Sequence, residues 1–157
     1  MYAFAAVDLV DGKLTTNLVD MPIKRKRKTA DSKNRLMQLA FAGFLRHLGK
    51  HYPANLHPRV VLVIDNAPWH RGKLIDEALA ANPHLEFYRL PSYSPQLNVI
   101  ERFWKILRRR ATHNRVFDTM KEMRGTLRNN FRYYQAYRRR ILSLIRSARK
   151  RAREAAA

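Results

Sequence analysis

The chain has 157 residues, no cysteine, and 32 Lys and Arg against 12 Asp and Glu, which gives a formal net charge of +20. That length suits one globular domain with appendages, and the missing cysteines exclude disulfides and thiolate metal sites. An enzyme that acts on small molecules does not need so high a net charge. The charge predicts a polyanionic partner, and nucleic acid is the first candidate.

The positive charge is concentrated in the C-terminal part of the chain. Residues 1–101 hold 14 Lys and Arg against 9 Asp and Glu, whereas residues 102–157 hold 18 against 3. No apolar run approaches the ~18 residues of a membrane span, and the first residues lack the pattern of a secretion signal. We therefore expect a soluble, cytoplasmic protein with no membrane contact.

The first twenty residues predict a β-hairpin. Residues 2–9 and 13–20 are the expected strands, with an Asp-Gly turn at 11–12. The basic run at residues 24–28 is hard to bury, so we expect an exposed loop that either contacts nucleic acid or is merely solvated. The candidate contacts in this loop are Lys24, Arg25 and Lys26.

A helix and a strand are expected next. Ser32 is a suitable N-cap, and apolar residues recur at helical spacing to about Lys50. The apolar face of this helix is predicted to consist of Leu36, Leu39, Ala40, Gly43, Phe44, His47 and Leu48. Residues 59–64 contain five consecutive apolar residues, a pattern typical of a parallel strand that is buried on both faces.

The following segment predicts a βαβ unit. We expect a helix over residues 72–81 and a strand over residues 85–90 that runs parallel to residues 59–64 through a right-handed crossover. Such sheets bind ligands beyond the carboxyl ends of their strands. Asp65 lies at that end and is therefore a candidate site residue.

A second carboxylate lies on the helix that follows. Ser94 and Pro95 predict the start of this helix, and Glu101, 36 positions after Asp65, falls at the margin of its apolar arc. The residues of that arc are Leu97, Ile100, Trp104 and Leu107. An ionised carboxylate near a core needs a partner, because burying it alone costs several kcal/mol.

Two explanations compete for these acids. Taken singly, Glu101 is explained by an ion pair with Arg102 or Arg108 or by a side chain that reaches solvent, and Asp65 by capping the helix that follows the strand. Taken together, the two carboxylates suit a shared Mg²⁺ or Mn²⁺ ion. Phosphoryl chemistry with two ions ~3.5–4 Å apart also needs a third, bridging carboxylate.

Two stretches of the chain resemble the second and third acidic motifs of DDE transposases: VIDNAPWH at residues 63–70 and LPSYSPQLNVIERFW at residues 90–104. The most similar group is the mariner-related bacterial insertion-sequence family six-thirty, and the resemblance covers roughly residues 1–125. One departure is Val99, where the family often has proline. The resemblance implies an α/β, ribonuclease-H-like fold with a mixed sheet flanked by helices. It also implies that Asp65 and Glu101 are the second and third acids and hold Mg²⁺ or Mn²⁺ for cleavage and strand transfer of double-stranded DNA.

The resemblance leaves the first acid open. In the family this acid lies on a first strand, upstream of the hairpin that residues 2–13 resemble. We expect that strand to be missing here, which points to a truncated copy, a fragment, or the second half of a split transposase whose partner is the upstream half. Alternatively, Asp8 is the first acid and residues 2–9 are the central strand. If the first strand is missing, we expect poor stability or recruitment of a strand from elsewhere, and no catalysis.

Further residues near the acids are candidates for supporting roles. His70 is expected either to contact the scissile phosphate or orient a water, or simply to pack in its loop. Asn66, Tyr93 and Asn98 are candidates for holding loops near the metal ions. Trp104 is expected in the core.

The chain is predicted to divide into a catalytic domain over residues 1–114 and a basic helical tail over residues 115–157. The tail is expected either to contact the DNA backbone or to be a solvated helical tail that is docked weakly through Ile141, Leu142 and Ile145. The candidate DNA contacts of the C-terminal half are Arg108, Arg109, Arg138, Arg139 and Arg140. The leading hypothesis is a DDE transposase catalytic domain, homodimeric or paired with an upstream half and associated with the nucleoid. The alternatives are a catalytically inactive DNA-binding remnant and a different ribonuclease-H-like nuclease.

Overall fold

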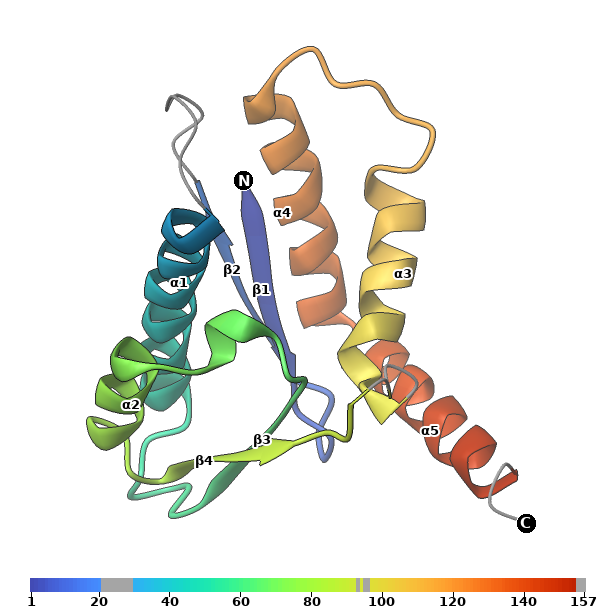
Figure 1. Ribbon diagram of the computed structural model, residues 1–157. Coiled ribbons are helices and arrows are strands. Elements are labelled where there is room, and N and C mark those ends of the chain that lie inside the picture. Colours follow the sequence, from blue (N-terminus) through green and yellow to red (C-terminus); the bar gives the residue numbers. More distant parts are fainter. Residues whose placement is uncertain (21–29, 93, 95–96, 155–157) are drawn as a thin grey trace. The chain divides into compact units, whose positions relative to one another are not determined.

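The computed structural model describes residues 1–20, 30–92, 94 and 97–154 (Figure 1). It is a mixed α/β structure, in which the described residues form five α-helices and two two-stranded sheets. The chain divides into two compact units: Met1–Phe4 with Asn17–Ser94, and Ala5–Thr16 with Pro95–Ala157. The expected division at residue 114 stays a prediction.

The N-terminal hairpin agrees with the predicted one. β1 (Tyr2–Val7) pairs with β2 (Leu14–Val19). The turn contains Gly12 at a φ of 73°, a left-handed conformation that glycine adopts without strain. Within the described residues β1 has β2 as its one strand partner, so the alternative in which residues 2–9 form a central strand is not borne out. The basic run that contains Lys24, Arg25 and Lys26 lies outside the described residues.

Helix α1 (Ala30–His51) begins two residues before the predicted N-cap, so Ser32 lies inside it. Its buried face also differs from the predicted one, because Leu36 and Leu39 are 38% and 48% exposed. The buried apolar residues that recur along the helix are Met37, Phe41, Phe44, Leu45 and Leu48. Phe44 and Leu48 belong to the predicted face as well, whereas Met37 and Phe41 are buried where Leu36 and Leu39 were expected.

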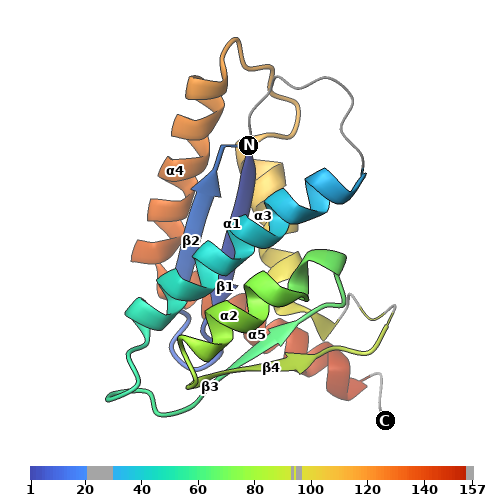
Figure 2. The same cartoon turned by 60° about the vertical axis from the view of Figure 1, so that its left-hand side comes forward.

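The predicted βαβ unit is confirmed. β3 (Val60–Ile64) and β4 (Leu85–Arg89) are parallel and are joined through α2 (Lys73–Ala80), which packs against α1 (Figure 2). The ring centroids of Phe41 and Phe87 are 6.2 Å apart, so α1 packs on the sheet face that carries Phe87.

The other face of this sheet is not buried as predicted. Val61 and Val63 are 49% and 41% exposed, although they belong to the five-residue apolar run. The apolar run therefore predicts the strand correctly, but the prediction that both faces of the strand are buried is wrong. Because the described strands form two separate pairs, a single mixed sheet is not confirmed.

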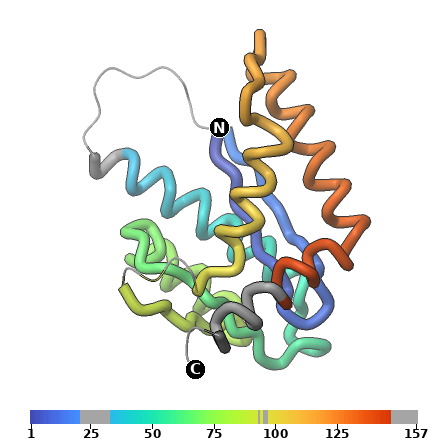
Figure 3. Tube along the Cα trace, turned by 90° about the vertical axis from the view of Figure 1, so that its right-hand side faces the viewer, coloured from blue at the N-terminus to red at the C-terminus, as the bar shows by residue number. Residues whose placement is uncertain are grey.

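Three helices form the core of the second unit, shown in yellow, orange and red in Figure 3. They are α3 (Val99–Ala111), α4 (Met120–Ala136) and α5 (Arg138–Glu154). Phe103 of α3 is 1% exposed, and its ring centroid lies 5.4 Å from that of Tyr134. The central core position of α3 is therefore Phe103, and the neighbouring Trp104, which was expected there, is only half-buried.

The start of α3 also differs from the prediction. The helix begins at Val99, and Asn98, whose backbone is extended, is its N-cap. Asparagine is a preferred residue at the N-cap position, although the Asn98 side chain makes no capping hydrogen bond here. Pro95 lies outside the described residues.

The C-terminal helices pack against the hairpin turn. Gln135 Nε2 donates to the carbonyl oxygen of Leu14 at 3.2 Å, and Arg138 Nη1 lies 2.9 Å from Asp11 Oδ2. Four apolar or aromatic side chains of these helices are buried: Phe131, Tyr134, Ile141 and Ile145. Part of the predicted tail is therefore packed, and Ile141 and Ile145 are buried as expected for side chains that dock it. No described helix is long and apolar enough to cross a membrane.

Candidate functional site

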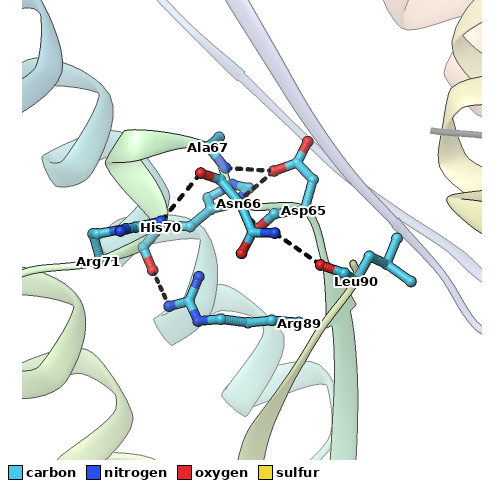
Figure 4. A network of polar contacts seen from close by, with 7 residues as sticks. All are labelled: Asp65, Asn66, Ala67, His70, Arg71, Arg89 and Leu90. Carbon is cyan, nitrogen blue, oxygen red and sulfur yellow. Dashed lines mark hydrogen bonds and ion pairs between the residues drawn. The ribbon is translucent and has the colours of Figure 1, made fainter. Parts of the chain in front are cut away.

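The candidate site lies where β3 ends, and Figure 4 shows the polar contacts around Asp65 at this point. Asp65 is the first residue after the strand, and its Oδ1 accepts a hydrogen bond from the backbone N–H of Ala67 at 3.0 Å. This bond closes a tight turn before the short 3₁₀ helix η1 (Pro68–His70). The Asp65 side chain is 52% exposed, so the carboxylate is held at one oxygen and open to solvent at the other end.

The side chain of His70, the last residue of η1, contacts the same carboxylate. Its Nδ1 lies 3.0 Å from Asp65 Oδ1 and 3.3 Å from the Asp65 carbonyl oxygen. Both neighbours can only accept, so Nδ1 carries the hydrogen and donates it, and the neutral ring keeps a lone pair on Nε2. Burial lowers the pKa of His70, while the hydrogen bonds to Asp65 oppose that shift by stabilising the charged ring.

Elements of the first unit hold the His70 ring and its loop. The ring centroid of Phe41 in α1 lies 4.3 Å from that of His70. Arg89 Nη2, at the end of β4, donates to the His70 carbonyl oxygen at 2.8 Å. Asn66 Nδ2 donates to the carbonyl oxygen of Leu90 at 2.8 Å, which ties the ends of the two strands together as expected for a loop-holding residue.

Sequence reasoning missed Arg89 and Phe41. A signal for Arg89 was available, because the parallel register pairs it with Ile64, directly before Asp65. The signal for Phe41 was masked by the wrong choice of apolar face on α1. The Asp65–His70 contact itself spans only five positions and follows from the local turn.

Glu101 lies in the first turn of α3 and belongs to the second unit. Its backbone N–H donates to the carbonyl oxygen of Asn98 at 3.1 Å, and its side chain is half-buried. The structure therefore brings Asp65 and His70 together, and a metal ion shared by Asp65 and Glu101 stays a prediction. Tyr93, a further candidate, lies outside the described residues.

The donor chemistry at Asp65 fits a hard divalent cation. Its Oδ1 is engaged by Ala67 and His70, whereas Oδ2 has no hydrogen-bond partner within the described part of the chain. A free carboxylate oxygen is a ligand that Mg²⁺ and Mn²⁺ prefer. No group of three Asp, Glu or His side chains that could hold a metal occurs among the described residues, and metal binding by Asp65 stays a prediction.

The side chains predicted to contact DNA differ in their surroundings. Arg108 and Arg109 are exposed in the last turn of α3, and Arg139 is exposed in α5. Arg138 instead forms the ion pair with Asp11. Arg140 lies over the ring of Tyr133 in α4, 5.3 Å from its centroid.

Asp8, the alternative first acid, has a structural role in the hairpin turn. Its Oδ1 accepts hydrogen bonds from the backbone N–H groups of Val10 and Asp11, at 2.8 and 3.3 Å. These bonds account for an aspartate at this position without a metal.

Comparison with known proteins identifies the family. The DDE superfamily endonuclease family model matches residues 16–124. The matched span includes Asp65, His70 and Glu101, together with the strand, turn and helix that carry them. Comparisons with curated proteins and with solved structures found no match. Because the matched span covers well over half of the chain, the protein belongs to the DDE superfamily endonuclease family.

Proposed function

We propose that this chain is the catalytic domain of a DNA transposase of the mariner-related insertion-sequence family six-thirty. Its reaction is metal-dependent cleavage of a DNA strand, followed by transfer of the freed 3′-hydroxyl to target DNA. The observation that carries the proposal is the Asp65 carboxylate at the end of β3, held 3.0 Å from His70 inside the span matched by the endonuclease family.

Asp65 and Glu101 are the residues that would hold Mg²⁺ or Mn²⁺. When bound, such an ion supplies a Lewis acid that activates the attacking oxygen and stabilises the leaving one. Asp65 suits this role because one of its oxygens is fixed by the turn while the other is open. Glu101 suits it because a half-buried carboxylate in the first turn of a helix is favoured by the helix dipole.

His70 is proposed to orient the attacking water. Its Nδ1–H is committed to Asp65, so the lone pair of Nε2 can accept a hydrogen bond from a water molecule. The packing of Phe41 and the bond from Arg89 to the His70 carbonyl fix the ring and its backbone. A ring held in this way keeps one tautomer and one direction, which is what positioning a water requires.

Double-stranded DNA is the proposed substrate. Residues 102–157 carry 18 Lys and Arg against 3 Asp and Glu, and the described arginines at the end of α3 and the start of α5 are exposed. Positive side chains that contact phosphates release counterions, so binding should weaken steeply as salt rises.

The proposal is tested by nicking of a labelled duplex in the presence of Mg²⁺. We expect Asp65→Asn and Glu101→Gln each to lower the rate at least about 100-fold, the order found when groups that tune a metal site are lost. Asp76→Asn is the matched control, because Asp76 is an exposed acid of α2 in the same unit as Asp65. Undiminished cleavage by Asp65→Asn would remove Asp65 from the site.

Two further outcomes decide between the alternatives. A wild-type chain that binds DNA but does not cut it with Mg²⁺ or Mn²⁺ would favour the noncatalytic DNA-binding hypothesis. Asp8→Asn keeps an oxygen acceptor for the hairpin turn, so loss of cleavage with an intact fold would assign Asp8 as the first acid.

A further inference from the structure

Three helices of the second unit bring two arginines to one aromatic ring. The ζ carbon of Arg110, at the end of α3, lies 4.7 Å from the ring centroid of Tyr133 in α4. The ζ carbon of Arg140, in the first turn of α5, lies 5.3 Å from the same centroid. Both distances are within the range of cation–π interactions, in which the face of the ring attracts the guanidinium.

These contacts fix the arginines to a rigid base. Hydrogen bonds to Tyr133 and Tyr134 raise the pKa of Arg110, and Tyr134 is 3% exposed in the core. Tyr133 also packs on Tyr137, with ring centroids 4.8 Å apart. Since both guanidinium distances are measured to one centroid, the two ζ carbons lie within about 10 Å of each other.

The arrangement lacks a matching negative charge. The first turn of α5 has three arginines and no acid. The positive end of the helix dipole repels these arginines, and a bound anion would offset that repulsion. Arg138 is neutralised by Asp11, but no acidic partner of Arg110 or Arg140 occurs among the described residues. Two fixed, exposed positive charges on a protein surface are the pattern expected where an anion binds.

We propose that Arg110, Tyr133 and Arg140 form a phosphate clamp for one strand of duplex DNA. The inference rests on the proposed function, which supplies DNA as the substrate. Successive phosphates advance ~3.4 Å along the axis per strand, so two guanidiniums this close reach one phosphate or near neighbours. Each guanidinium has five N–H donors, so donors remain for phosphate after the contacts with the tyrosines.

The clamp is tested by fluorescence anisotropy with a labelled duplex in EDTA, over a series of salt concentrations. Arg110→Gln with Arg140→Gln should weaken binding and reduce the slope of log affinity against log salt by about 1.8, the value for two phosphates. The matched control is Arg128→Gln with Arg132→Gln, which removes two exposed arginines of α4 and the same charge. The control should change the slope by less than half as much.

A second pair of variants tests the ring without changing the charge. Tyr133→Leu keeps both arginines but removes the face that holds them, and we expect about fivefold weaker binding. Tyr133→Phe keeps the ring and should lose less affinity than Tyr133→Leu. Urea unfolding of each variant shows whether the second unit is intact.

The clamp is overturned if the double variant and its control have the same slope, or if a folded Tyr133→Leu binds like the wild type. Binding in EDTA needs no cleavage, so the two proposals can fail separately. A chain that cuts DNA while the clamp variants bind normally refutes the clamp alone. A chain with clamp-dependent binding that never cuts DNA refutes the proposed catalysis alone.

Discussion

Replacing Gly49 by alanine should destabilise the first unit, against the usual trend for glycine in a helix. Gly49 lies near the end of α1, where α1 packs on α2. A Cβ at this position would lie 2.7 Å from Asn82 Cγ and would overlap Asn82 Oδ1. Asn82 cannot yield freely, because its Nδ2 donates to the Ala78 carbonyl oxygen at 2.9 Å.

The size of the effect follows from three terms. Forcing the Asn82 side chain aside costs about 1–3 kcal/mol as overpacking, and losing its hydrogen bond costs about 1 kcal/mol. Alanine recovers about 1 kcal/mol of helix propensity. We expect Gly49→Ala to lower the free energy of unfolding by about 1–3 kcal/mol. Gly43→Ala in the same helix, where nothing lies within 4 Å, should raise it by about 1 kcal/mol.

The assay is urea unfolding followed by tryptophan fluorescence. The chain has two tryptophans, and Trp69 belongs to the first unit while Trp104 belongs to the second. In a Trp104→Phe background the signal therefore reports the unit that contains Gly49. If Gly49→Ala stabilises that unit as much as Gly43→Ala does, the close packing of α1 on Asn82 is wrong.

Two other predictions concern the hairpin turn and the end of α1. Gly12→Ala should destabilise the second unit by about 2–4 kcal/mol in urea unfolding, because φ is 73° and the new Cβ would lie 2.9 Å from the Arg138 carbonyl oxygen; a loss under ~0.5 kcal/mol would contradict this packing. Burial lowers the pKa of His47 from 6.5, and the nearby charges of His51 and Lys50 lower it further. Below pH ~6.5 the unfolded chain therefore binds more protons than the folded chain, so the free energy of unfolding falls as pH falls. Thermal unfolding of His47→Gln should show a weaker loss between pH 7.5 and 5.5, and an unchanged pH profile would rule out this contribution.

The βαβ unit and the local part of the site could be predicted from the sequence. The five apolar residues of β3, the helix before Asn82 and the following strand are signalled by neighbours in the chain. The parallel register then places Asp65 at the carboxyl end of the sheet, and its contact with His70 needs only a tight turn. These features depend on interactions within a few residues or within one supersecondary motif.

The features that were mispredicted depend on distant partners. Both apolar faces of α1 satisfy helical spacing, and the choice is made by Phe4 and Phe87, whose rings contact Phe41. The exposure of Val61 depends on which elements cover that face of the sheet. The sequence around Val61 does not contain this information. The pairing of Arg138 with Asp11 joins residues 127 positions apart, so the ion pair could not be foreseen from the sequence.

The contact between the hairpin turn and the C-terminal helices has a consequence for synthesis. The second unit is discontinuous, since Ala5–Thr16 pack with residues more than a hundred positions later, whereas the first unit has its last residue at Ser94. Chains grow from the N-terminus and fold domain by domain. The first unit can therefore fold on the ribosome while the hairpin turn still waits for Gln135 and Arg138. The hairpin is among the first parts of the chain to be made and among the last to be fully packed.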